Sequence, residues 1–356
     1  MSLDSFQQKI VEAAARRTPL RLRGGGTKDF YGNEPRGEVL DTRSYAGIVD
    51  YEPTELVITA RGGTALSHLE EILQEKNQSL PFEPPHFGEQ ATVGGCVASG
   101  LSGPRRASAG ALRDFVLGVS VVDGRGRLLR FGGQVMKNVA GYDVSRLLAG
   151  SLGTLGFIAE VSLKVLPRAP AQQTLRLEMA EGAAIEALNG WAGRPLPVTA
   201  SAWHAGQLWL RLEGRAAAIE PAMAQIGGER VEAAHAQTLW SSVREHTHAF
   251  FGGAEPLWRL AVPGTTPPLA VGQEAAGATL IEWGGSLRWL KSSGEPARVR
   301  DAASRAGGHA TLFRAAHKAT PAFAPLAPAV LRVHRELKAA FDPSGILNPG
   351  RLVPEL

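Results

Sequence analysis

The sequence predicts an α+β protein, and three patterns lead to that prediction. Short runs rich in β-branched residues are mixed with segments whose apolar residues recur at helical spacing. The turn sequence Asp123-Gly124-Arg125-Gly126 joins two strand-like runs and is typical of an antiparallel hairpin. The chain of 356 residues, 44% apolar and 20% charged, is also long enough to form more than one domain with a buried core.

The first half contains most of the strand-like runs. Residues 20–23 alternate and end at three glycines, and residues 55–60 form a run rich in β-branched residues. Residues 65–78 place their leucines on one helical face, with Thr64 as the expected N-cap. The remaining expected elements are strands at 115–122, 128–131 and 157–165, the last with strict alternation, and a short helix at 143–149.

The second half has a different composition, which indicates a second domain. The first 166 residues hold 23 of the 42 glycines, whereas all seven tryptophans follow residue 190. Two prolines at positions 167 and 170 mark a plausible boundary. The elements expected beyond it are strands at 207–212 and 279–283 and alanine-rich helices at 216–226 and 296–305.

Composition excludes several classes of function. A net charge of +4 without a basic stripe does not indicate a nucleic-acid surface. No apolar run approaches the roughly 18 residues of a membrane helix, and the first residues lack a signal-peptide core. A single cysteine, Cys96, excludes an internal disulfide and a multi-cysteine cluster, and we interpret it as a small buried filler. We therefore expect a cytosolic chain that reaches a membrane only through partners.

Glycine clusters mark candidate ligand loops. Residues 23–28, Arg-Gly-Gly-Gly-Thr-Lys, combine backbone that can form an anion-binding nest with two cations and a hydroxyl, which is suitable chemistry for a pyrophosphate. The dinucleotide motif GxGxxG and the P-loop motif are both absent at this position. The glycines at 150, 153 and 156 lead into a strand, which is the wrong direction for a Rossmann loop.

An ordered set of motifs resembles the FAD-binding domain of the vanillyl-alcohol-oxidase/PCMH-type flavoproteins. The matching segments are residues 22–27, 60–64, 80–85, 91–95, 111–118, 137–143, 150–161 and 341–352. The resemblance implies two α+β subdomains that hold FAD, followed by a smaller α+β cap domain and a C-terminal segment that returns to the FAD domain. The implied boundaries are 1–167, 168–328 and 329–356.

The resemblance also implies the cofactor-binding residues. They are Arg23, Gly24, Gly25, Gly26, Thr27, Lys28, Thr92, Val93, Gly94, Gly95, Ser99, Gly100, Ser102, Gly103, Arg113, Asp114, Gly153, Gly156, Phe157, Ile158, Asn348 and Arg351. Some relatives attach the flavin through a histidine near the first loop. Because position 27 is threonine and residues 23–28 contain no histidine, we expect noncovalent FAD.

Within this family, segments such as 99–106, 256–263, 282–290 and 307–314 resemble the E subunits of bacterial glycolate oxidases. That resemblance implies an FAD-binding subunit that works with a catalytic flavoprotein subunit and an iron–sulfur subunit in the oxidation of glycolate. The histidine-containing motifs that the catalytic branch carries late in the chain are missing here. Two alternatives stay open: a self-sufficient FAD-dependent 2-hydroxy-acid dehydrogenase resembling D-lactate dehydrogenase, and a structural subunit with a vestigial flavin site.

Candidate catalytic residues lie in the second half. Arg259 and Arg288 stand beside tryptophans and could bind a carboxylate, and His309 is the histidine we would choose as a base. His246 and His248 form an HxH pair, which without a third ligand is more typical of a solvated helix face than of a metal site, so no metal is expected. The charged stretch 332–338 is likewise expected to be a solvated helix face.

Overall fold

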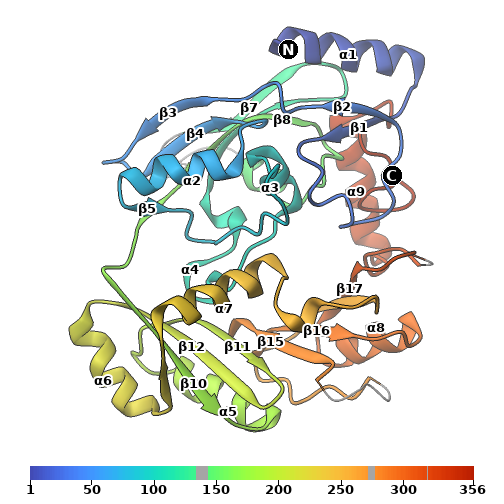
Figure 1. Cartoon of the computed structure of the whole chain (residues 1–356). Coiled ribbons are helices and arrows are strands. Elements are labelled where there is room, and N and C mark those ends of the chain that lie inside the picture. The colour runs from blue at the N-terminus through green and yellow to red at the C-terminus, as the bar shows by residue number, and fades with distance from the viewer. Residues whose placement is uncertain (134–142, 272–276, 319) are drawn as a thin grey trace. The chain divides into compact units, whose positions relative to one another are not determined.

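The computed structural model describes residues 1–133, 143–271, 277–318 and 320–356. They form two compact units, each a combination of antiparallel strands and helices, which confirms the α+β prediction (Figure 1). Unit 1 comprises residues 1–101, 111–167 and 325–356, and unit 2 comprises residues 102–110 and 168–324. The three-domain division with boundaries at 167 and 328 stays a prediction, and the grouping of residues 102–110 with unit 2 is an addition from the structure.

Unit 1 is built around a five-stranded antiparallel sheet with the strand order β3-β4-β8-β6-β7. Two small sheets accompany it, a parallel pair of β1 with β2 and an antiparallel pair of β5 with β9. The bounds are α1 Leu3–Arg16, β1 Leu20–Arg23, β2 Glu38–Asp41, β3 Ile48–Glu52, β4 Val57–Arg61, α2 Leu66–Glu75, β5 Gln78–Ser79, α3 Val93–Ser99, η1 Leu112–Phe115, β6 Val116–Val122, β7 Leu128–Gly132, η2 Ser145–Leu148, β8 Phe157–Lys164, β9 Leu166–Pro167 and α9 Pro328–Phe341.

One core of unit 1 joins the two ends of the chain. Phe6 and Ile10 of α1 are fully buried against Phe157 of β8. Ile346 and Leu347, from the C-terminal segment, belong to the same cluster of buried side chains. The C-terminal segment therefore returns to unit 1 as part of its hydrophobic core.

Two local expectations for unit 1 need correction, and one is confirmed. The strand expected at 157–165 is β8, the central strand of the sheet, and it is buried along most of its length. Thr64 does not cap α2, because its hydroxyl donates to the carbonyl oxygen of Gly47 and accepts the N–H of Gly47, at 3.1 and 2.9 Å. The short helix expected at 143–149 is a 3₁₀ turn over Ser145–Leu148.

The predicted hairpin between β6 and β7 is confirmed, and a buried carboxylate fixes its turn. The Asp123 side chain is completely buried, and its Oδ1 accepts the backbone N–H groups of Arg125 and Arg127, both at 2.9 Å. The guanidinium of Arg127 donates to Oδ2 at 2.7 Å. The turn thus surrounds one negative charge with backbone and side-chain donors.

Unit 2 contains an eight-stranded antiparallel sheet with the order β13-β10-β12-β11-β15-β16-β14-β17. Unit 2 includes the four elements expected from the sequence: the helices α6 and α8 have the expected bounds, and the strands β12 and β15 differ only at their C-terminal ends. The bounds are α4 Arg106–Ala109, β10 Ala171–Glu178, α5 Glu181–Ala192, β11 Val198–His204, β12 Gln207–Gly214, α6 Ala216–Ile226, β13 Glu229–Val231, α7 Ala233–Glu245, η3 Ala249–Phe251, β14 Leu257–Ala261, β15 Thr279–Glu282, η4 Trp283–Gly285, β16 Leu287–Lys291, α8 Pro296–Arg305 and β17 His309–Arg314.

The two faces of this sheet are covered differently. On one face, apolar side chains of the strands pack against α5 and α6 in one cluster and against α8 in another. On the other face, Trp240 and Val243 of α7 cover Ala200 and Ala202 of β11. Because side chains alternate along a strand, each strand residue belongs to one of these two surroundings.

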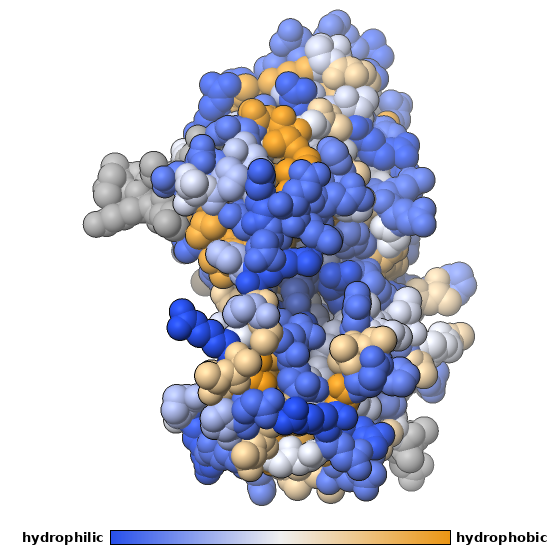
Figure 2. Space-filling view, turned by 60° about the vertical axis from the view of Figure 1, so that its left-hand side comes forward, coloured by the Kyte–Doolittle hydropathy of each residue, from blue (hydrophilic) through white to orange (hydrophobic). Residues whose placement is uncertain are grey.

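The face of the molecule seen in Figure 2 is mostly hydrophilic, with hydrophobic residues in small patches among hydrophilic ones. Within the described residues, no helix combines the length and the apolar composition needed to cross a membrane.

We expect Asp123→Ala to lower the free energy of unfolding by about 2–4 kcal/mol, because it leaves two backbone N–H groups and Arg127 without their buried acceptor. Urea unfolding measures the change. Asp301→Ala, at an exposed position of α8, is the control and should change stability by no more than about 0.5 kcal/mol. Equal effects of the two substitutions would contradict this account of the turn.

Candidate functional site

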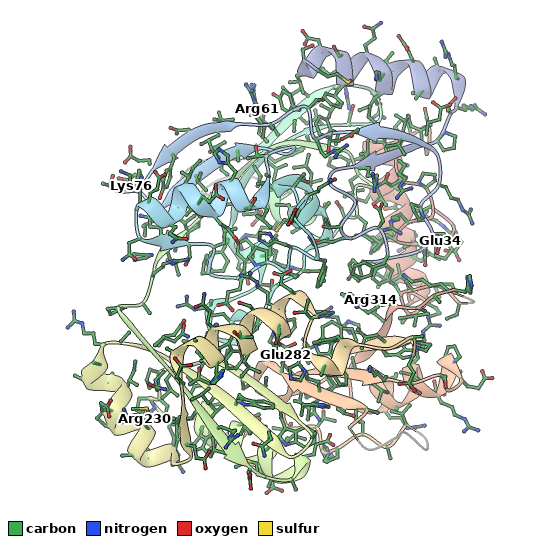
Figure 3. The ribbon with its side chains drawn as sticks, viewed as in Figure 1. Glu34, Arg61, Lys76, Arg230, Glu282 and Arg314 are labelled. Atoms are coloured by element: carbon green, nitrogen blue, oxygen red, sulfur yellow. The ribbon has the colours of Figure 1, made fainter. Side chains whose placement is uncertain are left out.

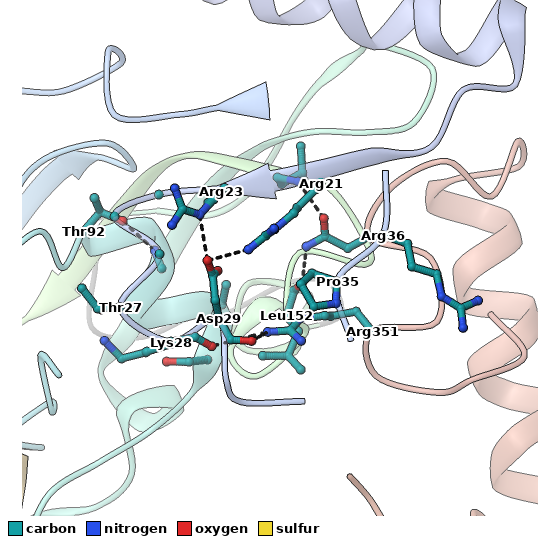
Figure 4. A pocket seen from close by; sticks show the side chains of 18 residues that line it. Arg21, Arg23, Thr27, Lys28, Asp29, Pro35, Arg36, Thr92, Leu152 and Arg351 are labelled. Carbon is teal, nitrogen blue, oxygen red and sulfur yellow. Dashed lines mark hydrogen bonds and ion pairs between the residues drawn. The ribbon is translucent and has the colours of Figure 1, made fainter. Parts of the chain in front are cut away.

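A pocket in unit 1 brings together segments that are far apart in the sequence (Figure 4). It lies where β1 runs into the first glycine loop, beside the short helix α3, the loop before β8 and the C-terminal segment. The lining residues are Arg21, Leu22, Arg23, Gly24, Gly25, Gly26, Thr27, Lys28, Asp29, Pro35, Arg36, Thr92, Gly95, Ala98, Ser99, Leu152, Asn348 and Arg351.

The first glycine loop offers backbone donors to this pocket. The N–H groups of Gly25, Gly26 and Thr27 form no hydrogen bond within the part of the chain that the structure describes. Consecutive N–H groups of this kind form a nest for an anion. The glycines are also sterically necessary, because a Cβ on Gly25 would overlap the carbonyl group of Gln90 and Gly26 has a φ of +73°.

Positive side chains surround the loop. Arg21 and Arg23 both donate to Oδ2 of Asp29, and the Arg23 bond measures 2.8 Å (Figure 4). The Nζ of Lys28 donates to the carbonyl of His86 at 3.1 Å. The pocket lining contains five cationic side chains and one carboxylate, so it favours an anionic ligand.

The segment from Thr92 to Ser99 forms one wall. The hydroxyl of Thr92 caps α3 by accepting the N–H of Gly95 at 3.2 Å. The N–H groups of Val93 and Gly94 donate to the carbonyls of Thr64 and Gly62, at 2.9 and 2.8 Å. Only Thr92 and Gly95 of residues 92–95 line the pocket, because the other two are held by the backbone behind it.

The C-terminal segment closes the pocket from the other side. Oδ1 of Asn348 accepts the N–H of Leu22 at 2.7 Å, and its Nδ2 donates to the carbonyl of Leu152 at 2.6 Å. The guanidinium of Arg351 donates to the carbonyls of Asp29 and Asn33. Burial lowers the pKa of Arg351 to about 10. Both side chains therefore line the pocket and also fix the backbone of the loops around it.

The structure brings together eleven of the residues that the resemblance implies for the cofactor. They are Arg23, Gly24, Gly25, Gly26, Thr27, Lys28, Thr92, Gly95, Ser99, Asn348 and Arg351. Sequence reasoning missed seven others that line the pocket: Arg21, Leu22, Asp29, Pro35, Arg36, Ala98 and Leu152. Asp29 and Arg21 were detectable in principle, since a carboxylate and an arginine flank the first loop.

The other implied cofactor residues lie outside this lining. Those in unit 1 are Val93, Gly94, Gly100, Arg113, Asp114, Gly153, Gly156, Phe157 and Ile158. Asp114 instead accepts the N–H of Ala111 at 2.8 Å in the turn before β6, and Phe157 and Ile158 are buried in β8. Ser102 and Gly103 belong to unit 2. The matching segment 137–143 lies outside the described residues except for Asp143.

In unit 2 the three candidate catalytic residues separate onto two faces of the sheet. Arg259 of β14 is opposite Trp289 and Thr311, and His309 shares their face, diagonal to Arg259. Arg288 is opposite Leu260, so its side chain points to the other face.

Arg288 is a structural residue. It is 2% exposed, and its guanidinium donates to the carbonyls of Gly285 and Thr266 at 2.6 and 2.7 Å. Burial lowers the pKa of Arg288 to about 10. The expectation that Arg288 could bind a substrate carboxylate is therefore not supported, since two of its nitrogens hold the backbone of unit 2.

Arg259 lies beside an aromatic ring. Its guanidinium is 5.2 Å from the ring centre of Trp283, and that of Arg106 is 4.5 Å from the same ring. Trp283 Nε1 donates to the carbonyl of Gly103 at 3.0 Å. Figure 3 labels Glu282 and Arg314, which come from the ends of two other strands of this sheet. Partial burial, together with the nearby charge of Arg259, lowers the pKa of His309.

The HxH pair is not a solvated helix face. His246 ends α7 in a left-handed conformation and stacks on Phe251 with 3.9 Å between ring centres. Burial, with the charges of Arg314 and Arg259, lowers its pKa well below the usual value. Cys96 is buried as expected, and burial raises its pKa to about 12. Across the described residues, no three His, Cys, Asp or Glu side chains lie close enough to hold a metal.

The fold and the pocket define a class of FAD-binding proteins, and comparison with known proteins agrees. Residues 2–132 match the model of the FAD binding domain, and residues 324–352 match that of the C-terminal domain of FAD linked oxidases. A solved structure of an alkyldihydroxyacetonephosphate synthase aligns over 97% of this chain and 75% of its own, with a TM-score of 0.67 and 15% identity.

Comparison with sequence relatives identifies the family within this class of FAD-binding proteins. The glycolate oxidase subunit GlcE of Escherichia coli K12 is 46% identical over 98% of this chain and 97% of its own length. The chain belongs to the GlcE family of FAD-binding proteins. The subunit GlcD of Bacillus subtilis and a D-lactate dehydrogenase of Archaeoglobus fulgidus are 31% and 34% identical over 48% and 42% of this chain, and 37% and 34% of their own lengths.

We expect Gly25→Ala to abolish FAD binding, because the new Cβ would displace the loop from the carbonyl of Gln90. Titration of the protein with FAD, followed by flavin fluorescence, measures the loss. Gly133→Ala is the control, since a Cβ there meets no atom within 4 Å. Unchanged FAD affinity in Gly25→Ala would show that this loop does not form the cofactor site.

Proposed function

We propose that this chain is the FAD-binding subunit of a complex that oxidises glycolate. The similarity to a glycolate oxidase subunit along nearly the full length of both chains supports the substrate and the assignment as a subunit. We further propose that a catalytic flavoprotein subunit and an iron–sulfur subunit are its partners, and that any association with a membrane occurs through them.

The observation that carries this proposal is a row of three N–H groups, at Gly25, Gly26 and Thr27, that have no partner among the described residues and are surrounded by cationic side chains. The pyrophosphate of FAD carries two negative charges and several acceptor oxygens, which fit this set of donors. A pocket that binds no cofactor does not require unpaired backbone donors or glycines at these positions. The arrangement therefore argues against a structural subunit with a vestigial site.

Each group has a distinct part in holding the cofactor. The loop N–H groups would donate to the pyrophosphate, and the guanidinium of Arg23 would add its charge. The carboxylate of Asp29 would keep Arg21 and Arg23 oriented at the loop. Bound FAD supplies the two-electron chemistry, and the protein supplies binding, orientation and charge.

The FAD is proposed to be noncovalent. Among the residues that the structure describes, the pocket lining contains no histidine, cysteine or tyrosine that could form a bond to the flavin. If this proposal holds, denaturation of the protein releases all of its FAD, and proteolysis yields no peptide that carries a flavin.

Arg23→Gln should weaken FAD binding about tenfold and reduce its dependence on salt, because one charge near the pyrophosphate is lost. FAD titrations at two ionic strengths test this. Arg130→Gln, an exposed position of β7, is the matched control and should leave both quantities unchanged. A salt dependence that remains the same in Arg23→Gln would contradict the role of Arg23.

An anaerobic visible spectrum tests the function of the whole chain. We expect FAD-loaded protein to keep an oxidised flavin when glycolate is added to it alone, and to be reduced by glycolate when the catalytic subunit is also present. A chain that binds no FAD would contradict the proposal, as would a bound flavin that stays oxidised in the complete complex.

A second candidate function, a self-sufficient 2-hydroxy-acid dehydrogenase, is favoured by one observation in unit 2. Arg259 has no ion pair with a carboxylate among the described residues, and His309 lies on the same face of the sheet. In this function Arg259 would bind the substrate carboxylate and His309 would accept the hydroxyl proton. The absence of the histidine motifs of the catalytic branch weighs against it.

If this second function holds, glycolate or D-lactate should bleach the flavin of the isolated chain. Arg259→Met should then raise the substrate concentration that gives half-maximal flavin reduction at least tenfold. Because the pKa of His309 is lowered, its neutral form persists below pH 6.5, and the rate should fall only in more acidic buffer. His309→Gln should remove this acidic limb. Lack of any bleaching by either acid would exclude this function.

A further inference from the structure

The helix α9 carries a buried lysine that the proposed function does not use. Lys338 is 6% exposed, and it is the one buried side chain of this helix. The expectation of a solvated face for residues 332–338 is therefore wrong at Lys338, whereas Arg332 and Arg335 are exposed. A buried ammonium group is costly unless every donor is satisfied, so the position needs a physical reason.

The ammonium group of Lys338 joins two segments of unit 1. Its Nζ donates to the carbonyl of Thr154 at 2.8 Å and to the carbonyl of Leu347 at 2.7 Å. The third bond goes to Oδ2 of Asp342, at 2.8 Å. The same Asp342 oxygen accepts the N–H of Leu347 at 2.7 Å. All three donors of the ammonium group are thereby used.

Both carbonyl partners lie next to the pocket lining. Thr154 is two residues from Leu152, and Leu347 directly precedes Asn348, whose Nδ2 donates to the carbonyl of Leu152. Lys338 itself is not part of the lining. It therefore connects the two loops from behind, at points where a small shift would move Leu152 and Asn348.

We propose that Lys338, paired with Asp342, is a positioning residue that holds the 150–156 loop and the C-terminal segment in the geometry required for binding FAD. This inference rests on the proposed binding of FAD in the pocket. A buried ion pair can often be replaced without loss of stability, so global stability and cofactor affinity should separate when the pair is removed.

The test uses the full chain and the double variant Lys338→Met/Asp342→Asn. Asparagine retains an acceptor for the N–H of Leu347, and no unpaired charge is left buried. We expect a thermal midpoint close to that of the wild type and an FAD dissociation constant raised about tenfold or more. Amide exchange in the absence of FAD should be faster in the two segments that Lys338 joins, residues 150–156 and 345–351. A second variant, Lys338→Gln/Asp342→Asn, is used if the first does not fold. Because its amides can still donate to one carbonyl, it should raise the FAD dissociation constant by less.

Arg335→Met is the matched control, because it removes one positive charge from an exposed position of the same helix. It should change FAD affinity by less than about twofold. A double variant that folds and binds FAD like the wild type would overturn the proposal, as would unchanged amide exchange in the two loops. If the wild type itself bound no FAD, the proposed function would fail, whereas the exchange measurement would still decide the positioning role.

Discussion

The first glycine loop must keep three consecutive backbone N–H groups unpaired and yet hold them in place. Backbone donors without partners are unfavourable once they leave water, so the loop cannot stabilise itself with its own hydrogen bonds. Its support comes from elsewhere: Gln90 and Thr92 pack against the glycines, and Asn348 accepts the N–H of Leu22 just before the loop. The site is therefore a product of long-range contacts, and a binding loop in the sequence is only one part of it.

The sheet of unit 2 shows how one residue type serves two purposes. Arg288 and Arg259 are one strand apart, and each stands beside a tryptophan in the sequence. Because side chains alternate along a strand, Arg288 points to the opposite face from Arg259, and its guanidinium donates there to backbone carbonyls. Arg259 points to the face that carries His309 and Thr311, where burial and the charge of Arg259 lower the pKa of that histidine. Strand register therefore decides which face of the sheet each guanidinium reaches.

The parts that could be predicted from the sequence are those with local signals. Glycine clusters, the hairpin turn at Asp123 and the order of motifs indicated the α+β fold and the first loop correctly. Residues whose roles depend on distant partners were misjudged or missed. Thr64 bonds Gly47 across a loop, His246 finds an aromatic stack, and Lys338 meets two carbonyls, none of which is visible in local spacing. The assignment of residues 102–110 to unit 2 depends likewise on tertiary contacts, such as the hydrogen bond between Trp283 and Gly103.

The return of the C-terminal segment has a consequence for biosynthesis. Ile346 and Leu347 complete the core around Phe6, and Asn348 and Arg351 complete the pocket. Residues 1–167 contain all the strands of the five-stranded sheet, but unit 1 is complete only with residues 325–356. Although domains generally fold in the order of their translation, unit 1 is therefore begun before unit 2 and completed after it. The pocket cannot be complete before residues 348–351 have been made, and a product truncated before them lacks Asn348 and Arg351.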